Sequence, residues 1–448
     1  MANYTLITEA APGARGRPKK EILREQVNRI RQMSDKRNEI RARWKKGIFL
    51  ALLALMIGLP TTASAADSLN EALTKGKFSL NARMRYENVS HEAVAEAANA
   101  VTVRLRYGYA TEEYKGFKVF IEGDFTRDLE PNSFNSTVNG KTAYPVVADP
   151  DSTRLNRVTV TYTGIRDTTV KVGRQRIKLD NDRFVGNVGF RQNEQTFDAV
   201  RVTNTSLKGV KLDYTYLWQV NRIFGSRSAG GKWDADTHLL NVSYDIDGVG
   251  KITAYSYLID LFNAPGLSNK TFGARFKGTH KVNDGLTITY AAEYATQTDY
   301  ARNPADFSLD YFMAAGGAGF QGFTARLSYE QLEGNGARGF VTPLATLHAF
   351  QGFTDNFLAT PGSGITELTG YADYVFKNVG GIGNIKVAAW YRDFDAQVGS
   401  EDLGGEFDFL VAAKPWKDVS LSLKYAKFSG ADLRPDVSKL WLTIGFSF

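Results

Sequence analysis

Apolar and polar residues alternate along most of the chain between Lys77 and Phe448. Within 77–89, for example, one set of alternate positions holds Phe78, Leu80, Ala82, Met84 and Tyr86, and the other holds Ser79, Asn81, Arg83, Arg85 and Glu87. A period of two predicts β-strands, and this region shows no convincing helical period. The repeated stretches are separated by Gly, Asn and Asp, which favour turns.

We place about 18 strands from this alternation. They lie near 77–89, 100–111, 117–127, 154–164, 168–176, 196–204, 209–219, 237–246, 250–260, 270–281, 286–297, 307–315, 322–332, 366–376, 384–394, 405–414, 418–428 and 438–448. On this placement the long connections follow odd-numbered strands, namely 128–153, 177–195, 220–236 and 333–365. Those after even-numbered strands are short, as in 163–167, 247–249, 282–285 and 414–417. The pattern predicts an all-β fold, a transmembrane antiparallel up-and-down barrel with short periplasmic turns and long outer loops.

The last predicted strand ends on an aromatic residue. Leu440, Leu442, Ile444, Phe446 and Phe448 alternate with polar or small residues and with Trp441. Outer-membrane barrels commonly finish this way, so we expect Phe448 to engage the barrel-assembly machinery and the barrel to sit in outer-membrane lipid. A closed barrel is also the one way left to satisfy backbone groups in hydrocarbon without long apolar helices.

The first 65 residues have a different composition. They hold 13 Lys and Arg against 5 Asp and Glu, which leaves 42 basic and 43 acidic residues in the rest of the chain. Lys45 and Lys46 precede a short apolar run, and Ala63-Ser64-Ala65 has the small-x-small form of a signal-peptidase site. We expect 1–65 to be a signal sequence cleaved after Ala65, with Met33 as an alternative start, and 66–76 to be a short periplasmic segment.

The basic run Arg15 to Lys20 is therefore interpreted as part of this leader, and no nucleic-acid partner is expected.

In the barrel, strand parity points many charged residues inward. Most of these opposite charges are expected to neutralise one another across strands. The first two predicted strands carry a local surplus of positive charge on their inward face. Arg83, Arg85, Arg104 and Arg106 lie there with Glu87 as the one acidic residue nearby. Such a face would attract an anionic solute.

The segment from Gly173 to Ala199 differs from its surroundings. It contains Gly173-Arg174-Gln175-Arg176, then an Asp-, Arg- and Gly-containing loop, and then Gln195-Thr196-Phe197-Asp198-Ala199. This combination resembles the alginate-export family of outer-membrane porins. The resemblance implies an 18-stranded, monomeric barrel that passes a polyanionic uronate polymer through an arginine-lined constriction narrowed by long loops.

Carried over by motif, Arg174, Arg176 and Arg191 become candidates for the constriction, and 180–191 becomes the loop that narrows the pore. Strict parity from Val170 and Val172 would instead aim Arg174 at lipid. Either Gly173 marks a β-bulge, or Arg174 lies above the hydrocarbon at the strand end.

Other chemistry has little support in the sequence. Cysteine is absent, so no disulfide or thiolate site forms. His91, His238, His280 and His348 lack a nucleophile elbow or paired carboxylates beside them, so we expect neither an enzyme nor a cofactor. Asp180 and Asp182 are weak calcium candidates, because the other spaced ligands of a calcium loop are missing.

These features favour a passive outer-membrane channel for an anionic polysaccharide, alginate-like, or a related anionic solute. One alternative is a general or hydrocarbon-type diffusion porin without preference for polyanions. Another is a structural or adhesive barrel that displays its outer loops, 333–365 above all.

Overall fold

The computed structural model describes residues 66–129, 133–431 and 434–448. The predicted signal sequence, residues 1–65, lies outside the described residues. The predicted periplasmic segment from Ala66 is described. The strands are β1 (Lys77–His91), β2 (Ala98–Ala110), β3 (Phe117–Asp128), β4 (Ser152–Ile165), β5 (Thr168–Gln175), β6 (Thr196–Asn204), β7 (Val210–Asn221), β8 (Lys232–Ile246), β9 (Gly250–Ile259), β10 (Asn269–Lys281), β11 (Leu286–Asp299), β12 (Ser308–Phe320), β13 (Phe323–Leu332), β14 (Ile365–Phe376), β15 (Ile385–Asp395), β16 (Asp402–Trp416), β17 (Val419–Ser429) and β18 (Val437–Ser447).

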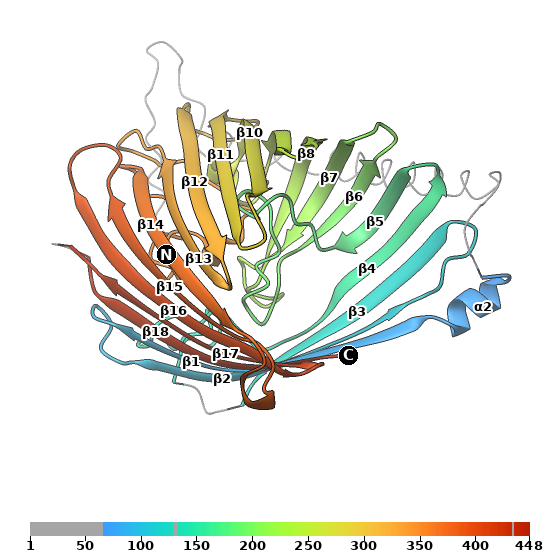
Figure 1. The fold of residues 1–448 in the computed structure, drawn as a ribbon, viewed down its shortest axis with the longest axis horizontal. Coiled ribbons are helices and arrows are strands. Elements are labelled where there is room, and N and C mark those ends of the chain that lie inside the picture. The colour runs from blue at the N-terminus through green and yellow to red at the C-terminus, as the bar shows by residue number, and fades with distance from the viewer. Residues whose placement is uncertain (1–65, 130–132, 432–433) are drawn as a thin grey trace, which may run out of the picture. The chain divides into compact units, whose positions relative to one another are not determined.

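The strands form one closed antiparallel barrel. Each strand pairs with its neighbours in the sequence, and β1 pairs with both β2 and β18, which closes the 18-stranded sheet. Figure 1 shows the blue strands at the start of the barrel beside the red strands at its end. Closure leaves no unpaired sheet edge, so the backbone groups of the wall are satisfied within the sheet. The predicted fold class and strand number are confirmed.

The two faces of each strand differ as the alternation predicts. On β18, Leu442 and Ile444 are 45% and 54% exposed on the outer face, whereas Lys439 and Trp441 are buried on the inner face. Exposed apolar residues recur on the outer faces of the other strands, which is the surface that lipid requires. The terminal Phe448 continues the pairing, with its N–H and C=O bonded to Leu80 at 2.8 and 2.9 Å.

The connections sort by length as predicted, with some different boundaries. The long ones join β3 to β4, β5 to β6, β7 to β8 and β13 to β14. The predicted turn 414–417 is wrong in its first part, because β16 continues to Trp416 through a register shift after Ala413. Pro415 has no N–H for the ladder, and an irregular pair accommodates it. Likewise, β4 continues to Ile165 through a shift after Tyr162, inside the predicted turn 163–167.

The segment before β1 holds α2 (Leu69–Thr74), whose N-terminus is capped by the Ser68 side chain. The Tyr109 hydroxyl donates to the Leu73 carbonyl at 2.5 Å, which ties this short helix to β2. None of the helices in the described part of the chain is long and apolar enough to cross a membrane.

Candidate functional site: a lumen narrowed by two inserted loops

Two long loops fold inward and pack against each other inside the barrel. They are the β5–β6 loop (176–195) and the β13–β14 loop (333–364). Val185 and Leu344 form a β-bridge between them, and the Gly186 N–H donates to the Leu344 carbonyl at 2.9 Å. Phe184 is buried against Tyr311 of β12 and Phe340, with ring centroids 5.4 and 6.1 Å away. Figure 1 shows green loop segments inside the ring of strands.

The arginine-rich wall of β1 and β2 holds the β5–β6 loop. Arg83 Nε donates to Gln192 Oε1 at 2.9 Å, Arg85 Nη1 to the Phe190 carbonyl at 2.8 Å, and Arg106 Nη2 to the Gln192 carbonyl at 3.0 Å. Arg104 bonds to Asn81. The arginines face the lumen as parity predicts, but three of the four guanidinium groups are engaged by loop groups rather than open to a solute. The surplus of positive charge therefore anchors the constriction.

Arg191 lies at the centre of the buried loops. Its guanidinium lies 3.0 Å from Glu87, 3.7 Å from Asp149 and 3.2 Å from Asp355. Burial opposes the charge of this group, but the three carboxylates outweigh burial and raise the pKa of Arg191. One buried cation thus joins β1 to the β3–β4, β5–β6 and β13–β14 loops.

Glu194 is the acidic counterpart in the same loop. Its carboxylate accepts bonds from Arg176 and Asn187, each at 2.7 Å, and lies 3.5 Å from Arg106. Burial disfavours its charge, yet Arg106 and Arg176 lower the pKa of Glu194. Arg176, a constriction candidate from the motif, binds a buried carboxylate of the inserted β5–β6 loop.

Arg174 lies on the opposite face of the wall. In the strand register it pairs with Val158, which in turn pairs with Ile121, a residue 49% exposed on the outer face. The ladder shows no register shift at Gly173, so the strict parity holds and Arg174 points outward. Its partner is Asp198, with Nε to Oδ1 at 2.7 Å. The expectation that Arg174 lines the constriction is thereby corrected: it sits one residue before the end of β5, on the outside.

His348 of the β13–β14 loop is also buried inside the barrel. Its Nδ1 lies 2.7 Å from Asp355, its Nε2 lies 3.0 Å from Lys424 of β17, and its ring stacks on Phe190 at 3.6 Å. Burial is the largest cause that lowers the pKa of His348 to about 3, although Asp355 opposes the shift. The imidazole is neutral at pH 7, so it donates through one nitrogen and accepts through the other. His348 and Asp355 both fall in the predicted outer loop 333–365, and no local sequence pattern shows that this loop turns inward and brings them together.

The remaining candidates have other partners. Asp182 pairs with Lys178 at 3.0 Å, and Asp180 accepts a bond from Asn241 at 3.1 Å. No group of three or more metal-ligating side chains occurs among the described residues. His238 bonds to the Tyr214 hydroxyl at 2.8 Å, and the His91 ring accepts from the Ala93 N–H.

Charges on the lumen wall are distributed unequally between buried and open positions. Nine wall carboxylates that form ion pairs are at most 8% exposed, and they are Glu87, Glu122, Asp124, Asp213, Glu293, Glu330, Glu367, Asp373 and Asp408. Asp245 of β8, which pairs with Lys251, has a side chain that is 62% exposed. By contrast, Lys118, Lys277 and Arg326 are exposed, and within the described part of the chain none of them forms an ion pair. The open lumen surface is therefore more positive than its composition suggests.

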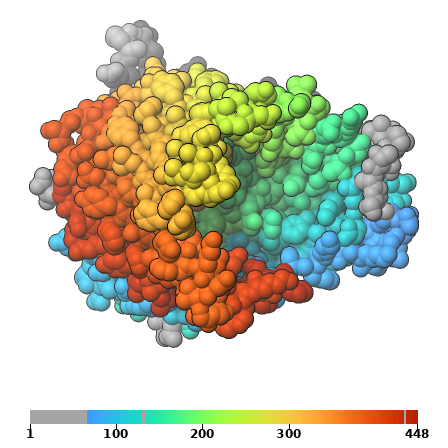
Figure 2. All heavy atoms as spheres, in the orientation of Figure 1, coloured from blue at the N-terminus to red at the C-terminus, as the bar shows by residue number. Residues whose placement is uncertain are grey.

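Three cavities adjoin this framework. One of about 400 Å³ lies along β10 to β15 beside Phe350. A second, of about 190 Å³, is lined by Lys178, Arg201, Lys211, Lys251 and Lys277 together with Asp180 and Asp213. Figure 2 shows a hollow in the middle of the visible face, between yellow and green atoms.

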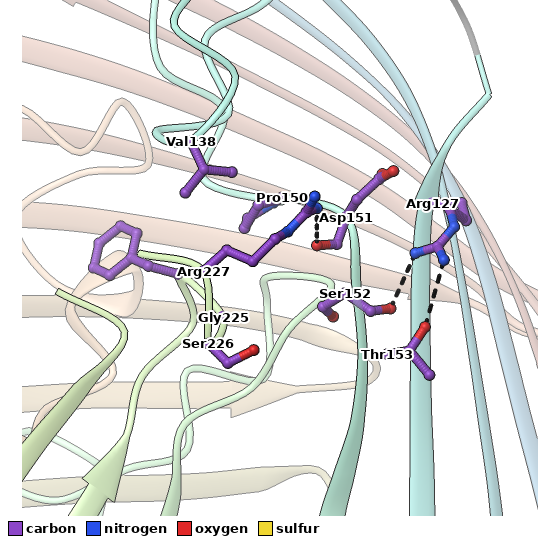
Figure 3. Close-up of a pocket in the computed structure, with 10 residues that line it drawn as sticks. Arg127, Val138, Pro150, Asp151, Ser152, Thr153, Gly225, Ser226 and Arg227 are labelled. Carbon is purple, nitrogen blue, oxygen red and sulfur yellow. Dashed lines mark hydrogen bonds between the residues drawn. The ribbon is translucent and has the colours of Figure 1, made fainter. Parts of the chain in front are cut away.

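The third cavity, of about 330 Å³, lies where the β7–β8 loop meets the start of β4 (Figure 3). Arg227 Nη2 donates to the Asp151 carbonyl at 2.7 Å, and Arg127 Nη1 contacts the Ser152 carbonyl at 3.4 Å. Arginines thus bind loop backbone at the barrel end as they do in the lumen.

A closed 18-stranded barrel with an apolar outer face and a charged lumen defines a porin of the outer membrane. A model of the alginate export family matches residues 75–325, more than half of the chain. The chain belongs to this family.

Solved structures share the same architecture. OpdQ of Pseudomonas aeruginosa is 16% identical with a TM-score of 0.66, over 84% of this chain and 99% of that chain. OpdK of the same species, solved with vanillate, is 14% identical with a TM-score of 0.65, over 84% and 98%. OccK9 (OpdG), also from this species, is 14% identical with a TM-score of 0.66, over 84% and 100%. At this identity the likeness concerns the fold. A search of curated proteins gives no match.

Proposed function

We propose that this barrel is a passive diffusion channel for anionic saccharides or related carboxylates, with a uronate polymer of the alginate type as the first candidate solute. The observation that carries the proposal is the unequal exposure of lumen charges. Nine wall carboxylates lie buried in ion pairs and the exposed Asp245 is paired with Lys251, whereas Lys118, Lys277 and Arg326 face the open lumen without a carboxylate partner among the described residues. An anion entering the lumen meets unneutralised positive charge, and a cation does not meet the matching negative charge.

Membership of the alginate export family supports the polymeric solute. The structural relative OpdK was solved with vanillate, which supports a smaller carboxylate. Both solutes carry the carboxylate that the lumen cations would recognise.

The experiment that tests the proposal is the reversal potential of the refolded barrel in a planar bilayer under a salt gradient. We expect anion selectivity and a concentration-dependent block of the current by oligouronates. Equal permeability of anions and cations, with no block, would overturn the proposal.

A general porin without polyanion preference is the second candidate. It is favoured by the small charge difference of the chain after residue 65, with 42 basic and 43 acidic residues. A ratio of anion to cation permeability near one, together with rapid diffusion of neutral sugars through the barrel, would support this candidate. The adhesive alternative required an outwardly displayed β13–β14 loop, but His348, Gln351 and Thr354 of this loop contact wall residues.

A further inference from the structure

Small side chains lie between two cations in a row that crosses the inner wall beside the β13–β14 loop. The strand register places its members directly opposite one another from β10 to β15: Lys277, Ala291, Ala315, Ser328, Thr369 and Arg392. The adjacent inward-facing row is Thr279, Thr289, Gly317, Arg326, Tyr371 and Trp390. Between the cations of these rows, the wall carries methyl groups, hydroxyls and one glycine.

Apart from Gly317, the residues of these two rows line the cavity of about 400 Å³. Ala349 and Phe350 of the β13–β14 loop and the ion-paired carboxylates Glu330 and Glu367 also line it. Gly317 leaves no room for a side chain, since a Cβ atom there would come within 2.8 Å of the Ala325 carbonyl oxygen and 3.0 Å of Thr289 Oγ1. Strands are spaced by about 4.8 Å, so the small-residue trough runs for roughly 24 Å around the wall. Figure 1 allows these strands to be followed from yellow β10 to orange β15.

Two of the three cations at the trough, Lys277 and Arg326, form no ion pair among the described residues, whereas Arg392 binds Glu367 and Asp408. Lys277 lies directly opposite Lys251 in the β9–β10 ladder, and Lys251 pairs with Asp245 at 3.5 Å. Like charges directly opposite each other destabilise a sheet, so a bound anion would relieve this pair. Arg326 has its guanidinium 5.1 Å from the Tyr371 ring, and it forms no ion pair among the described residues.

The other end of the trough is aromatic. Tyr371 and Trp390 lie with ring centroids 4.8 Å apart, and the Tyr371 hydroxyl donates to Asp373 at 2.6 Å. An aromatic surface beside hydroxyl groups and open cations suits a sugar ring that carries a carboxylate.

We propose that this trough, built from β10 to β15, is a binding site for a short acidic oligosaccharide that lies along the wall. Lys277 and Arg326 hold its carboxylates, Thr289, Ser328 and Thr369 meet its hydroxyls, and Tyr371 with Trp390 contacts a ring face. This proposal rests on the proposed function and extends it. The lumen cations attract any anion, whereas the trough would bind the saccharide itself.

Two variants test the site through the block of single-channel current by a defined oligouronate. Ala315→Phe fills the middle of the trough without changing any charge. Lys277→Gln with Arg326→Gln removes both open cations. A matched control, Lys118→Gln with Lys171→Gln, removes two inward-facing lysines of β3 and β5 that are remote from the trough in the strand order. Heat-dependent migration on a gel confirms that each barrel is folded.

We expect Ala315→Phe to weaken the block at least about tenfold while the reversal potential stays that of the natural protein. The trough double variant should also weaken the block at least about tenfold, and the control should shift the reversal potential but keep the block within about twofold. Equal loss of block in the trough and control pairs, or an unchanged block in Ala315→Phe, would overturn the trough. A natural protein that shows neither selectivity nor block would overturn the proposed function instead.

Discussion

Arg191 and Glu87 form a buried ion pair between the inserted β5–β6 loop and β1, with Nη1 3.0 Å from Oε2. The same guanidinium reaches Asp355 at 3.2 Å, so one side chain fixes both inserted loops to the wall. Lys439 of β18 also binds Asp355, with Nζ 2.9 Å from the carboxylate, and so ties the β13–β14 loop to a second wall strand. The width of the lumen therefore depends on a few charged contacts as well as on the wall.

Arg191→Ala should release the loops without unfolding the barrel. Truncation leaves Glu87, Asp149 and Asp355 without this partner, and breaking a buried pair in this way costs about 3–5 kcal/mol. We expect a larger and noisier single-channel conductance, and faster proteolysis within 176–195. Arg227→Ala is the control, since Arg227 is exposed and bonds to one backbone carbonyl. Natural conductance and protease resistance in Arg191→Ala would show that hydrophobic packing around Phe184 holds the loops alone.

The sequence predicted the wall far better than the lumen. Alternation follows directly from the two faces of a strand, so Arg83 and Arg85 were correctly assigned inward. Their partners, Gln192 and the Phe190 carbonyl, belong to an irregular loop whose path depends on tertiary contacts. No period in the sequence encodes that path.

Arg174 shows how motif and parity can disagree. Alternation from Val170 and Val172 aimed it outward, the motif assigned it to the constriction, and the register agrees with the alternation. Arg176 lies beyond the last residue of β5, where parity no longer applies, and its guanidinium binds Glu194 of the inserted loop.

Separate variants of these two arginines should therefore differ. Arg176→Gln removes one of the two arginines that pair with Glu194, leaving Arg106, and should change conductance and ion selectivity. Arg174→Gln alters an outward ion pair with Asp198 and should leave both channel properties unchanged, with a small loss of stability of about 0–1 kcal/mol. Reversal potentials and conductance in planar bilayers distinguish the two, and a selectivity change in Arg174→Gln would contradict the outward placement.

Gly173 is required by its backbone conformation. Its φ is +117°, and a Cβ atom would come within 2.2 Å of the Val158 carbonyl oxygen in the neighbouring strand. Gly173→Ala should lower the free energy of unfolding by about 1–3 kcal/mol, because the strand must shift or the strain must be kept. Urea titration of the folded band on a gel measures this change. Gly316→Ala is the matched control, since nothing lies within 4 Å of its Cβ position, and an equal effect in both would argue against strain at Gly173.

Docking of the β13–β14 loop should weaken as the pH falls below about 6.5. Burial holds the pKa of docked His348 at about 3, against 6.5 for the unperturbed side chain. Between these pH values the undocked loop binds a proton at His348 that the docked loop does not bind. The free energy that favours docking is therefore at its full value above pH 6.5. It falls by up to about 1.4 kcal/mol for each pH unit below 6.5.

Current recordings between pH 7.5 and pH 5 should therefore show more frequent openings at the lower pH. His348→Gln keeps a donor for Asp355 and an acceptor for Lys424 but does not titrate, so its opening frequency should change far less over this range. Protonation strengthens the attraction of His348 to Asp355, yet it places a cation beside Lys424 and Arg191 and removes the acceptor that Lys424 uses at 3.0 Å. The repulsion and the burial of charge together outweigh the single attraction. Identical pH dependence in His348→Gln and the natural protein would assign the openings to another group.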